Sequence, residues 1–129
     1  MKSAALQGLA PAQVVYGTCF FYGNRVKKDT AEAIKWYRLA ADQNDSYGQH
    51  YLGACYLHGE GSVKKDDKEA FRWISQSAQL GNKEAMLSVA KCYREGIGVA
   101  KNETETVKWL KQAATLKQIQ RRANWDTAT

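Results

Sequence analysis

The feature that most constrains this chain is a unit of 36 or 37 residues that occurs three times. Its tryptophans, Trp36, Trp73 and Trp109, are 37 and 36 residues apart, and its three cysteines are 36 and 37 residues apart. Each cysteine begins a similar five-residue motif that ends in glycine, at 19–23, 55–59 and 92–96. Repeats with a period of roughly 20–50 residues are typical of solenoids, in which each unit packs only on its neighbours.

Each unit predicts two helices joined by a loop. We expect the first helices over 11–22, 47–58 and 84–95, because small or apolar residues recur there at helical spacing and a glycine follows each segment. The second helices are expected to start after Asp29, Asp66 and Asn102, each followed three residues later by a glutamate, as in a capping box. The sequence therefore predicts an all-α chain of stacked helical hairpins.

Both ends depart from the repeat. Residues 4–8 match residues 77–81, so the chain opens with the tail of a second helix, either as a truncated cap or as part of a longer array. The last residues are more polar, and Trp125 either folds back onto the last groove or lies in a frayed tail. We expect one domain over 1–129: a partial leading helix over 1–8, repeats over 9–44, 45–81 and 82–117, and a C-terminal cap or tail over 118–129.

The second unit carries the most specific words, which are Leu52-Gly53, Tyr56, Gly59, Gly61, Val63 to Asp66, Glu69-Ala70, Trp73 and Ser77-Ala78. With these words the chain resembles the Sel1-like repeat family over residues 4–116. The resemblance implies a right-handed α/α superhelix related to tetratricopeptide arrays, whose first helices line the concave face. It also implies a role as an adaptor or scaffold, and the bacterial members include signalling modulators, host-interaction factors and immunity proteins.

Three positions depart from the family pattern. Arg25 stands where the loop has its second glycine, Gly48 replaces the usual alanine, and Val107 is interpreted as the replacement of the alanine before Trp109. These departures bear on local loop geometry and packing rather than on the family.

The sequence contains no motif for catalysis: a nucleophile elbow, a Gly-rich phosphate loop and a His-Glu-x-x-His pair are all absent. The cysteines of stacked repeats would lie ~10 Å apart, whereas a disulfide needs Cα atoms within about 7 Å. We therefore expect buried thiols, with a redox or metal role as the alternative. His50 and His58 lack the further ligands of a metal site. We expect no enzyme activity, no cofactor and no metal.

The formal net charge of +6 favours weak attraction to acidic partners but falls short of the dense basic face of a nucleic-acid binder. Lysines recur in the inter-helix loops, and contact of this edge with nucleic acid or anionic lipid is an alternative function; they are Lys27, Lys28, Lys64, Lys65 and Lys101. No apolar run reaches the ~18 residues of a membrane span. We expect a cytoplasmic location, with the periplasm or secretion open if a longer precursor exists.

The outward positions of the first helices change from aromatic to charged along the array. We predict that they form a concave binding face, with Phe21, Tyr22, Tyr47 and Leu57 as apolar anchors. The full set is Val14, Thr18, Phe21, Tyr22, Tyr47, His50, Ala54, Leu57, His58, Leu87, Lys91 and Arg94. The sequence thus favours non-enzymatic binding of another protein, by an adaptor or by an immunity protein that neutralises a toxin. Packing of these residues on an upstream repeat or on the tail, and self-association through open ends, are the alternatives.

Overall fold

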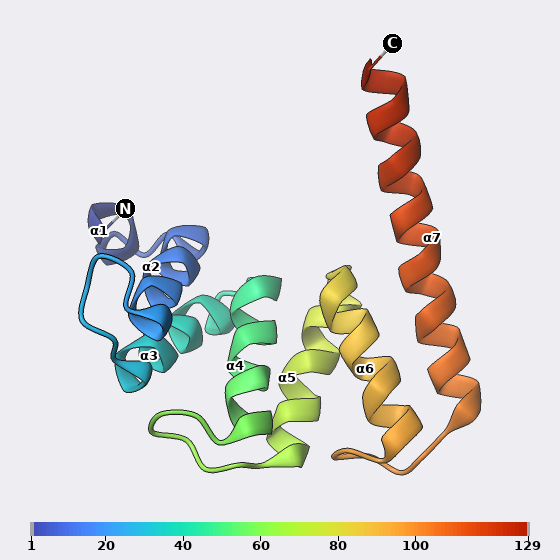
Figure 1. The fold of residues 1–129 in the computed structure, drawn as a ribbon, viewed down its shortest axis with the longest axis horizontal. Coiled ribbons are helices and arrows are strands. Elements are labelled where there is room, and N and C mark those ends of the chain that lie inside the picture. The colour runs from blue at the N-terminus through green and yellow to red at the C-terminus, as the bar shows by residue number, and fades with distance from the viewer. Residues whose placement is uncertain (1, 129) are drawn as a thin grey trace.

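The computed structural model describes the backbone of residues 2–128 and the side chains of residues 4–123. Within this range every regular element is an α-helix, and the bounds are α1 Lys2–Leu6, α2 Ala10–Tyr22, α3 Thr30–Asp42, α4 Ser46–His58, α5 Asp67–Gln79, α6 Lys83–Glu95 and α7 Glu103–Ala128. The helices follow one another across the molecule in chain order, with α7 at the far end (Figure 1). The predicted all-α solenoid is confirmed.

The second helices begin where the sequence predicts, because a side chain caps each of them. An aspartate or asparagine oxygen accepts a hydrogen bond from the main-chain N–H three residues on: Asp29 from Glu32 at 3.1 Å, Asp66 from Glu69 at 3.1 Å and Asn102 from Glu105 at 3.0 Å. These bonds satisfy main-chain donors that the first turn of a helix leaves free. The first helices end, as predicted, at a left-handed glycine in every repeat.

The repeats stack because the second helices of the first two repeats each pack between two first helices. Helix α3 lies against α2 and α4, and α5 lies against α4 and α6. The repeated tryptophans are buried, and two clusters of buried residues run through the stack, one around Tyr37 and Leu52 and the other around Ile74 and Val89. Most burial therefore comes from contacts between adjacent hairpins, as in other solenoids.

Helix α1 takes the place of a second-helix tail. Its Ala5 is buried, and Gln13 Nε2 donates a hydrogen bond to the Ala5 carbonyl oxygen at 3.3 Å. The same bond recurs one repeat later, where Gln49 Nε2 donates to the Ala41 carbonyl oxygen at 3.4 Å. A buried glutamine thus ties the start of a first helix to the preceding helix at both junctions.

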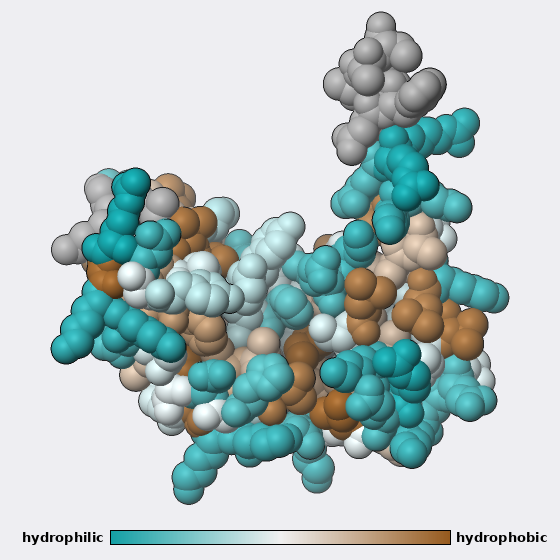
Figure 2. Space-filling view, viewed as in Figure 1, coloured by the Kyte–Doolittle hydropathy of each residue, from teal (hydrophilic) through white to brown (hydrophobic). Residues whose placement is uncertain are grey.

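Helix α7 continues without a break to Ala128, and its C-terminal part extends well beyond α6 (Figure 1). Residues 117–123 are exposed, and this part of the surface is hydrophilic in Figure 2. On the part that packs against α6, Val107 and Leu110 are 48% and 39% exposed, whereas their equivalents Ile34 and Tyr37 in α3 are 3% and 2% exposed. The stacking face of α7 is therefore uncovered in the described structure. The side chain of Trp125, with its two expected placements, lies outside the described residues.

Of the three departures from the family pattern, one has a structural explanation here and another was assigned to the wrong residue. A β-carbon on Gly48 would lie 2.8 Å from the Ala40 β-carbon, so α4 approaches α3 too closely for an alanine. The interpretation of Val107 was wrong. Ala33 and Ala70 each stand three residues before the tryptophan of their repeat. The residue three before Trp109 is the buried Thr106.

Candidate functional site

The first helices lie next to one another along one side of the solenoid. Helix α2 packs directly against α4, and across the next junction Nε2 of His50 in α4 lies 3.5 Å from Oγ of Ser88 in α6. Two depressions that share Tyr51 adjoin each other between α2 and α4. We call them together the inner groove, and distinguish its open depression from its aromatic pocket.

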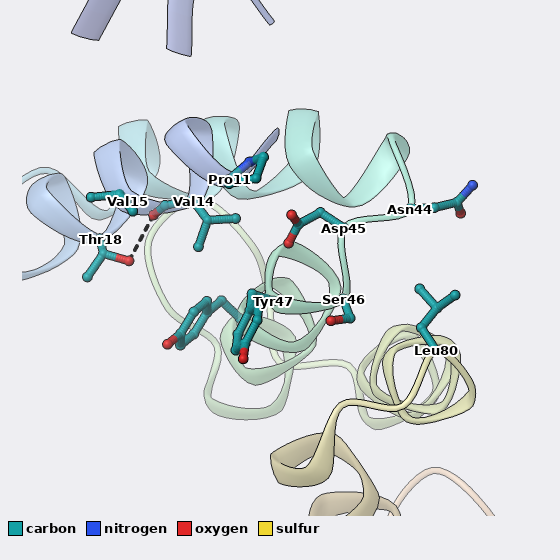
Figure 3. A pocket seen from close by; sticks show the side chains of 10 residues that line it. Pro11, Val14, Val15, Thr18, Asn44, Asp45, Ser46, Tyr47 and Leu80 are labelled. Atoms are coloured by element: carbon teal, nitrogen blue, oxygen red, sulfur yellow. Dashed lines mark hydrogen bonds between the residues drawn. The ribbon is translucent and has the colours of Figure 1, made fainter. Parts of the chain in front are cut away.

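The open depression has a volume of about 770 Å³ and draws its walls from α2, the turn between α3 and α4, α4, and the end of α5. It is lined by Pro11, Val14, Val15, Thr18, Asn44, Asp45, Ser46, Tyr47, Tyr51 and Leu80. Figure 3 shows Val14 directed from α2 toward Tyr47, with Leu80 on the opposite side. Most of its lining is apolar, which suits aliphatic or aromatic side chains of a ligand.

The aromatic pocket is smaller, with a volume of about 260 Å³. It is lined by Phe21, Tyr22, Tyr37, His50, Tyr51, Ala54, Cys55, His58 and Glu60. The Tyr37 ring stacks on Tyr51 with centroids 5.2 Å apart, and the Tyr37 hydroxyl lies 2.9 Å from Oγ1 of Thr18. The pocket wall is therefore fixed to the core by stacking and by a hydrogen bond.

Eight of the twelve predicted residues line the inner groove. The open depression contains Val14, Thr18 and Tyr47, and the aromatic pocket contains Phe21, Tyr22, His50, Ala54 and His58. Four do not line it, namely Leu57, Leu87, Lys91 and Arg94. Leu87, Lys91 and Arg94 are exposed on α6, beyond the groove, and Arg94 pairs with Glu95 at 3.7 Å. The groove thus belongs to the first two repeats and their junction with α5.

Three of the predicted outward residues are more buried than expected. Val14 is buried in the first core cluster and forms the floor of the open depression, so its outward assignment was wrong. Phe21 and Leu57 are half-buried, Phe21 against the first core cluster and Leu57 against the second. Replacement of either residue would lower stability as well as binding, so neither is a clean probe of the groove.

The structure adds Val15, Tyr51 and Leu80 to the groove, all of them exposed. Alignment of the repeats would have found the first two, because Val15, Tyr51 and Ser88 occupy one column and two of the three are apolar. Leu80 could not have been found in this way. Leu80 is the C-cap of α5, and it lies at the groove because the second hairpin stacks on the first.

Burial lowers the pKa of His50 below its ordinary value of 6.5, although the nearby Glu84 opposes the shift. A folded state with the lower pKa binds the proton more weakly than the unfolded chain. The neutral His50 ring therefore favours the folded state. This contribution to stability is complete above pH 6.5 and is lost as the pH falls through the folded-state pKa. In an NMR titration we expect the His50 ring signals to change with a midpoint below 6.5, and His50→Gln to reduce the loss of stability on acidification. A midpoint at or above 6.5 would contradict the burial seen here.

All three cysteines are free, and the predicted burial is confirmed for two of them but not for the third. Cys55 and Cys92 are buried while Cys19 is half-buried, and burial raises the pKa of Cys55 and of Cys92 to about 11. Because the thiolate is the reactive form, we expect iodoacetamide to label Cys19 first in the folded protein. Mass spectrometry after timed alkylation measures this order, with the urea-unfolded chain as the control in which all three react. Equal native rates at Cys19 and Cys92 would contradict the packing.

The loop lysines have a role in the fold. Lys28, Lys65 and Lys101 lie against the glycines that end α2, α4 and α6. Lys65 also pairs with Asp67 at 2.6 Å. In Figure 2 the hydrophilic side chains gather along the edge where these loops run.

Among the described residues, a metal-binding cluster and a helix suited to cross a membrane are both absent. No group of three or more His, Cys, Asp or Glu side chains lies close enough to hold a metal ion there. None of the helices in this range combines the length and the apolar character that a membrane span requires.

Comparison with known families decides where the chain belongs. The family model of the Sel1 repeat matches residues 10–45, 46–82 and 83–117. The chain belongs to the Sel1 repeat family. Sel1 repeats generally serve as protein–protein interaction modules and are typically non-catalytic. The Sel1 identity explains the repeated tryptophans, the loop glycines and the paired small residues as one recurrent packing unit.

Similar solved structures come from three bacteria. A protective antigen of uropathogenic Escherichia coli with an SLR fold has a TM-score of 0.85 and 34% identity, covering 88% of this chain and 24% of its own. A Sel1 repeat protein from Oxalobacter formigenes has a TM-score of 0.82 and 32% identity, covering 85% and 43%. Cysteine-rich protein B of Helicobacter pylori has a TM-score of 0.72 and 25% identity, covering 89% and 86%.

A curated relative, a putative Sel1-like repeat-containing protein of Acanthamoeba polyphaga mimivirus, is 38% identical over 61 residues. The match spans 47% of this chain and 11% of the viral protein. The chain thus corresponds to a small part of this relative and of the E. coli antigen.

Proposed function

We propose that the chain binds a segment of another protein in the inner groove. The observation that carries this proposal is the convergence of exposed apolar side chains on one open depression. Val15 comes from α2, Tyr47 from α4 and Leu80 from the end of α5. Contiguous exposed apolar surface is uncommon on a soluble protein without a partner. Aromatic residues at the centre of such a surface supply most of the binding energy in protein interfaces.

The groove is built to dock a partner without reorganising. Its floor, Val14, belongs to the core, and the Tyr37–Tyr51 stack and the Thr18–Tyr37 contact hold the wall between the two depressions. The turn at Asp45 is fixed because its side chain accepts the Gly48 N–H at 3.0 Å. A preformed surface loses little conformational entropy on association, so more of its contact energy becomes affinity.

Two biological roles use such a groove. An adaptor holds its partner within a larger assembly, whereas an immunity protein covers a toxin and blocks it. The identity of the protein that co-purifies distinguishes these roles. As part of this proposal we place the chain in the cytoplasm, because a reducing compartment suits three free thiols.

Replacement of two exposed residues that line the open depression, one from α2 and one from α4, tests the proposal. We expect Val15→Ser with Tyr47→Ser to weaken binding of the co-purified protein by at least about tenfold, since both side chains lose apolar contact area. Isothermal titration calorimetry measures the affinity, and thermal unfolding followed by circular dichroism checks that the variant folds.

Leu39→Ser is the matched control. Leu39 is 41% exposed, like Val15 at 44%, but it lies on α3 outside the groove. The control is expected to bind as the original chain does. Unchanged affinity in the double variant, or an equal loss in the control, would count against the groove.

A further inference from the structure

We propose that the aromatic pocket of the inner groove receives a cationic side chain of the bound protein, an ammonium of lysine or a guanidinium of arginine. This inference rests on the proposed function, because it names the chemistry that one part of the groove selects. The open depression would take apolar side chains and the aromatic pocket a positive charge. The partner segment would therefore carry both kinds of residue.

The walls of the pocket are aromatic rings from three helices. Phe21 and Tyr22 of α2 contact each other edge to face with centroids 5.0 Å apart, and Tyr37 of α3 stacks on Tyr51 of α4. The His50 ring lies 5.7 Å from that of Tyr51. Ring faces carry negative potential and attract cations, most strongly where several rings surround a partly desolvated site. A guest can reach the exposed rings of Tyr22 and Tyr51, and these surroundings favour a positive guest over a neutral one of the same shape.

The charges of the lining have the sign that a cation requires. Glu60 contributes a carboxylate, and neither lysine nor arginine is among the described residues that line the pocket. Burial lowers the pKa of His50, so this imidazole is uncharged at neutral pH, and burial raises the pKa of Tyr37 to about 12, so its hydroxyl keeps its proton. The overall charge of +6 attracts acidic surfaces at long range, whereas Glu60 is the one residue of the described pocket lining with a formal charge when histidines are counted as neutral.

The size of the pocket fits one side chain. Its volume of about 260 Å³ is below the ~300–1,000 Å³ of pockets that enclose whole drug-sized ligands. It also opens beside the larger depression and shares Tyr51 with it. A peptide segment that lies along the open depression can therefore insert one long side chain into the aromatic pocket.

Small probes test the pocket without any partner. The chain is titrated with the N-acetyl methylamides of lysine, arginine and trimethyllysine, and with the neutral analogue of trimethyllysine in which tert-butyl replaces trimethylammonium. NMR follows the ring protons of Tyr22, His50 and Tyr51. We expect saturable shifts with the cationic probes and about fivefold or greater weakening for the neutral analogue. The lysine and arginine arms identify the preferred cation.

Two variants and a control locate the binding. Tyr22→Leu removes an exposed ring and Glu60→Gln removes the carboxylate, and each is expected to weaken the cationic probes by about fivefold. Tyr47→Leu, an exposed tyrosine of the open depression, is expected to leave probe binding unchanged. Equal binding of the neutral analogue, shifts that do not saturate, or full binding by Tyr22→Leu would overturn the proposal.

The two proposals fail separately. A chain that binds its protein partner through Val15 and Tyr47 but shows no preference for cationic probes retains the proposed function and loses this inference. In the second case, the chain binds the cationic probes but the Val15→Ser and Tyr47→Ser double variant keeps its affinity for the partner. The cation preference of the pocket is then retained and the proposed function is lost.

Discussion

Gly98→Ala is expected to lower the free energy of unfolding by about 2–5 kcal/mol. Gly98 has a φ of +69°, where an alanine is strained. A β-carbon there would also overlap the carbonyl oxygen of Asp67 and lie 3.0 Å from the Phe71 β-carbon. The loop of the third repeat rests directly on the first turn of α5, so it cannot accept the extra atom without moving off the second hairpin.

Gly81→Ala is the matched control, because it separates strain from overlap. Gly81 has a φ of +95°, but nothing lies within 4 Å of a β-carbon built on it. Its replacement is expected to cost about 1–2 kcal/mol, from backbone strain alone. Urea unfolding followed by circular dichroism measures both variants. An equal loss in the two would show that the loop does not press on α5 as described.

The same contact explains why Arg25 is tolerated in the first repeat. Gly61 lies over Thr30 of the preceding hairpin, as Gly98 lies over Asp67. Arg25 has a φ of +66°, so it keeps the loop conformation. Within the described residues Arg25 is exposed, so no first turn of a second helix lies against it as one does against Gly61 and Gly98. The exposed arginine therefore meets backbone strain but no overlap.

Ile74→Ala is expected to cost about 2–5 kcal/mol, whereas Leu110→Ala should cost less than about 1 kcal/mol. The two residues are equivalent, one position after the tryptophan of their repeat. Ile74 is 1% exposed in the second core cluster, where the third hairpin covers it. Leu110 lies on the uncovered face of α7, so its replacement leaves almost no cavity.

Urea unfolding of this chain measures the difference, and the pair serves as its own control because the position in the repeat is the same. Equal losses would mean that burial in the solenoid does not come from the next hairpin. A large loss at Leu110 alone would mean that α7 packs differently from the described structure.

The fold followed from the sequence because its determinants are local and repeated. The caps at Asp29, Asp66 and Asn102 and the small residues beside each tryptophan recur in register, and three copies remove the ambiguity that one copy would leave. The interpretation of Val107 failed because the alanine of the other repeats stands three residues before the tryptophan, and Val107 stands only two residues before Trp109.

The groove was only partly predictable. Helical spacing identified Thr18, Tyr22 and Tyr47, but it could not tell that neighbouring helices bury Val14 and half-bury Phe21. Those contacts depend on how far one hairpin rotates against the next. Leu80 enters the groove for the same reason, since it belongs to the end of another helix.

Photo-crosslinking tests most directly whether a protein partner lies in the inner groove. Benzoylphenylalanine is placed at Tyr47, inside the groove, or at Leu39, outside it, and each variant is irradiated with the co-purified protein. We expect a covalent adduct from position 47 and none from position 39, with the attached residues forming one continuous segment of the partner. An adduct from position 39 with none from position 47 would contradict binding in the groove.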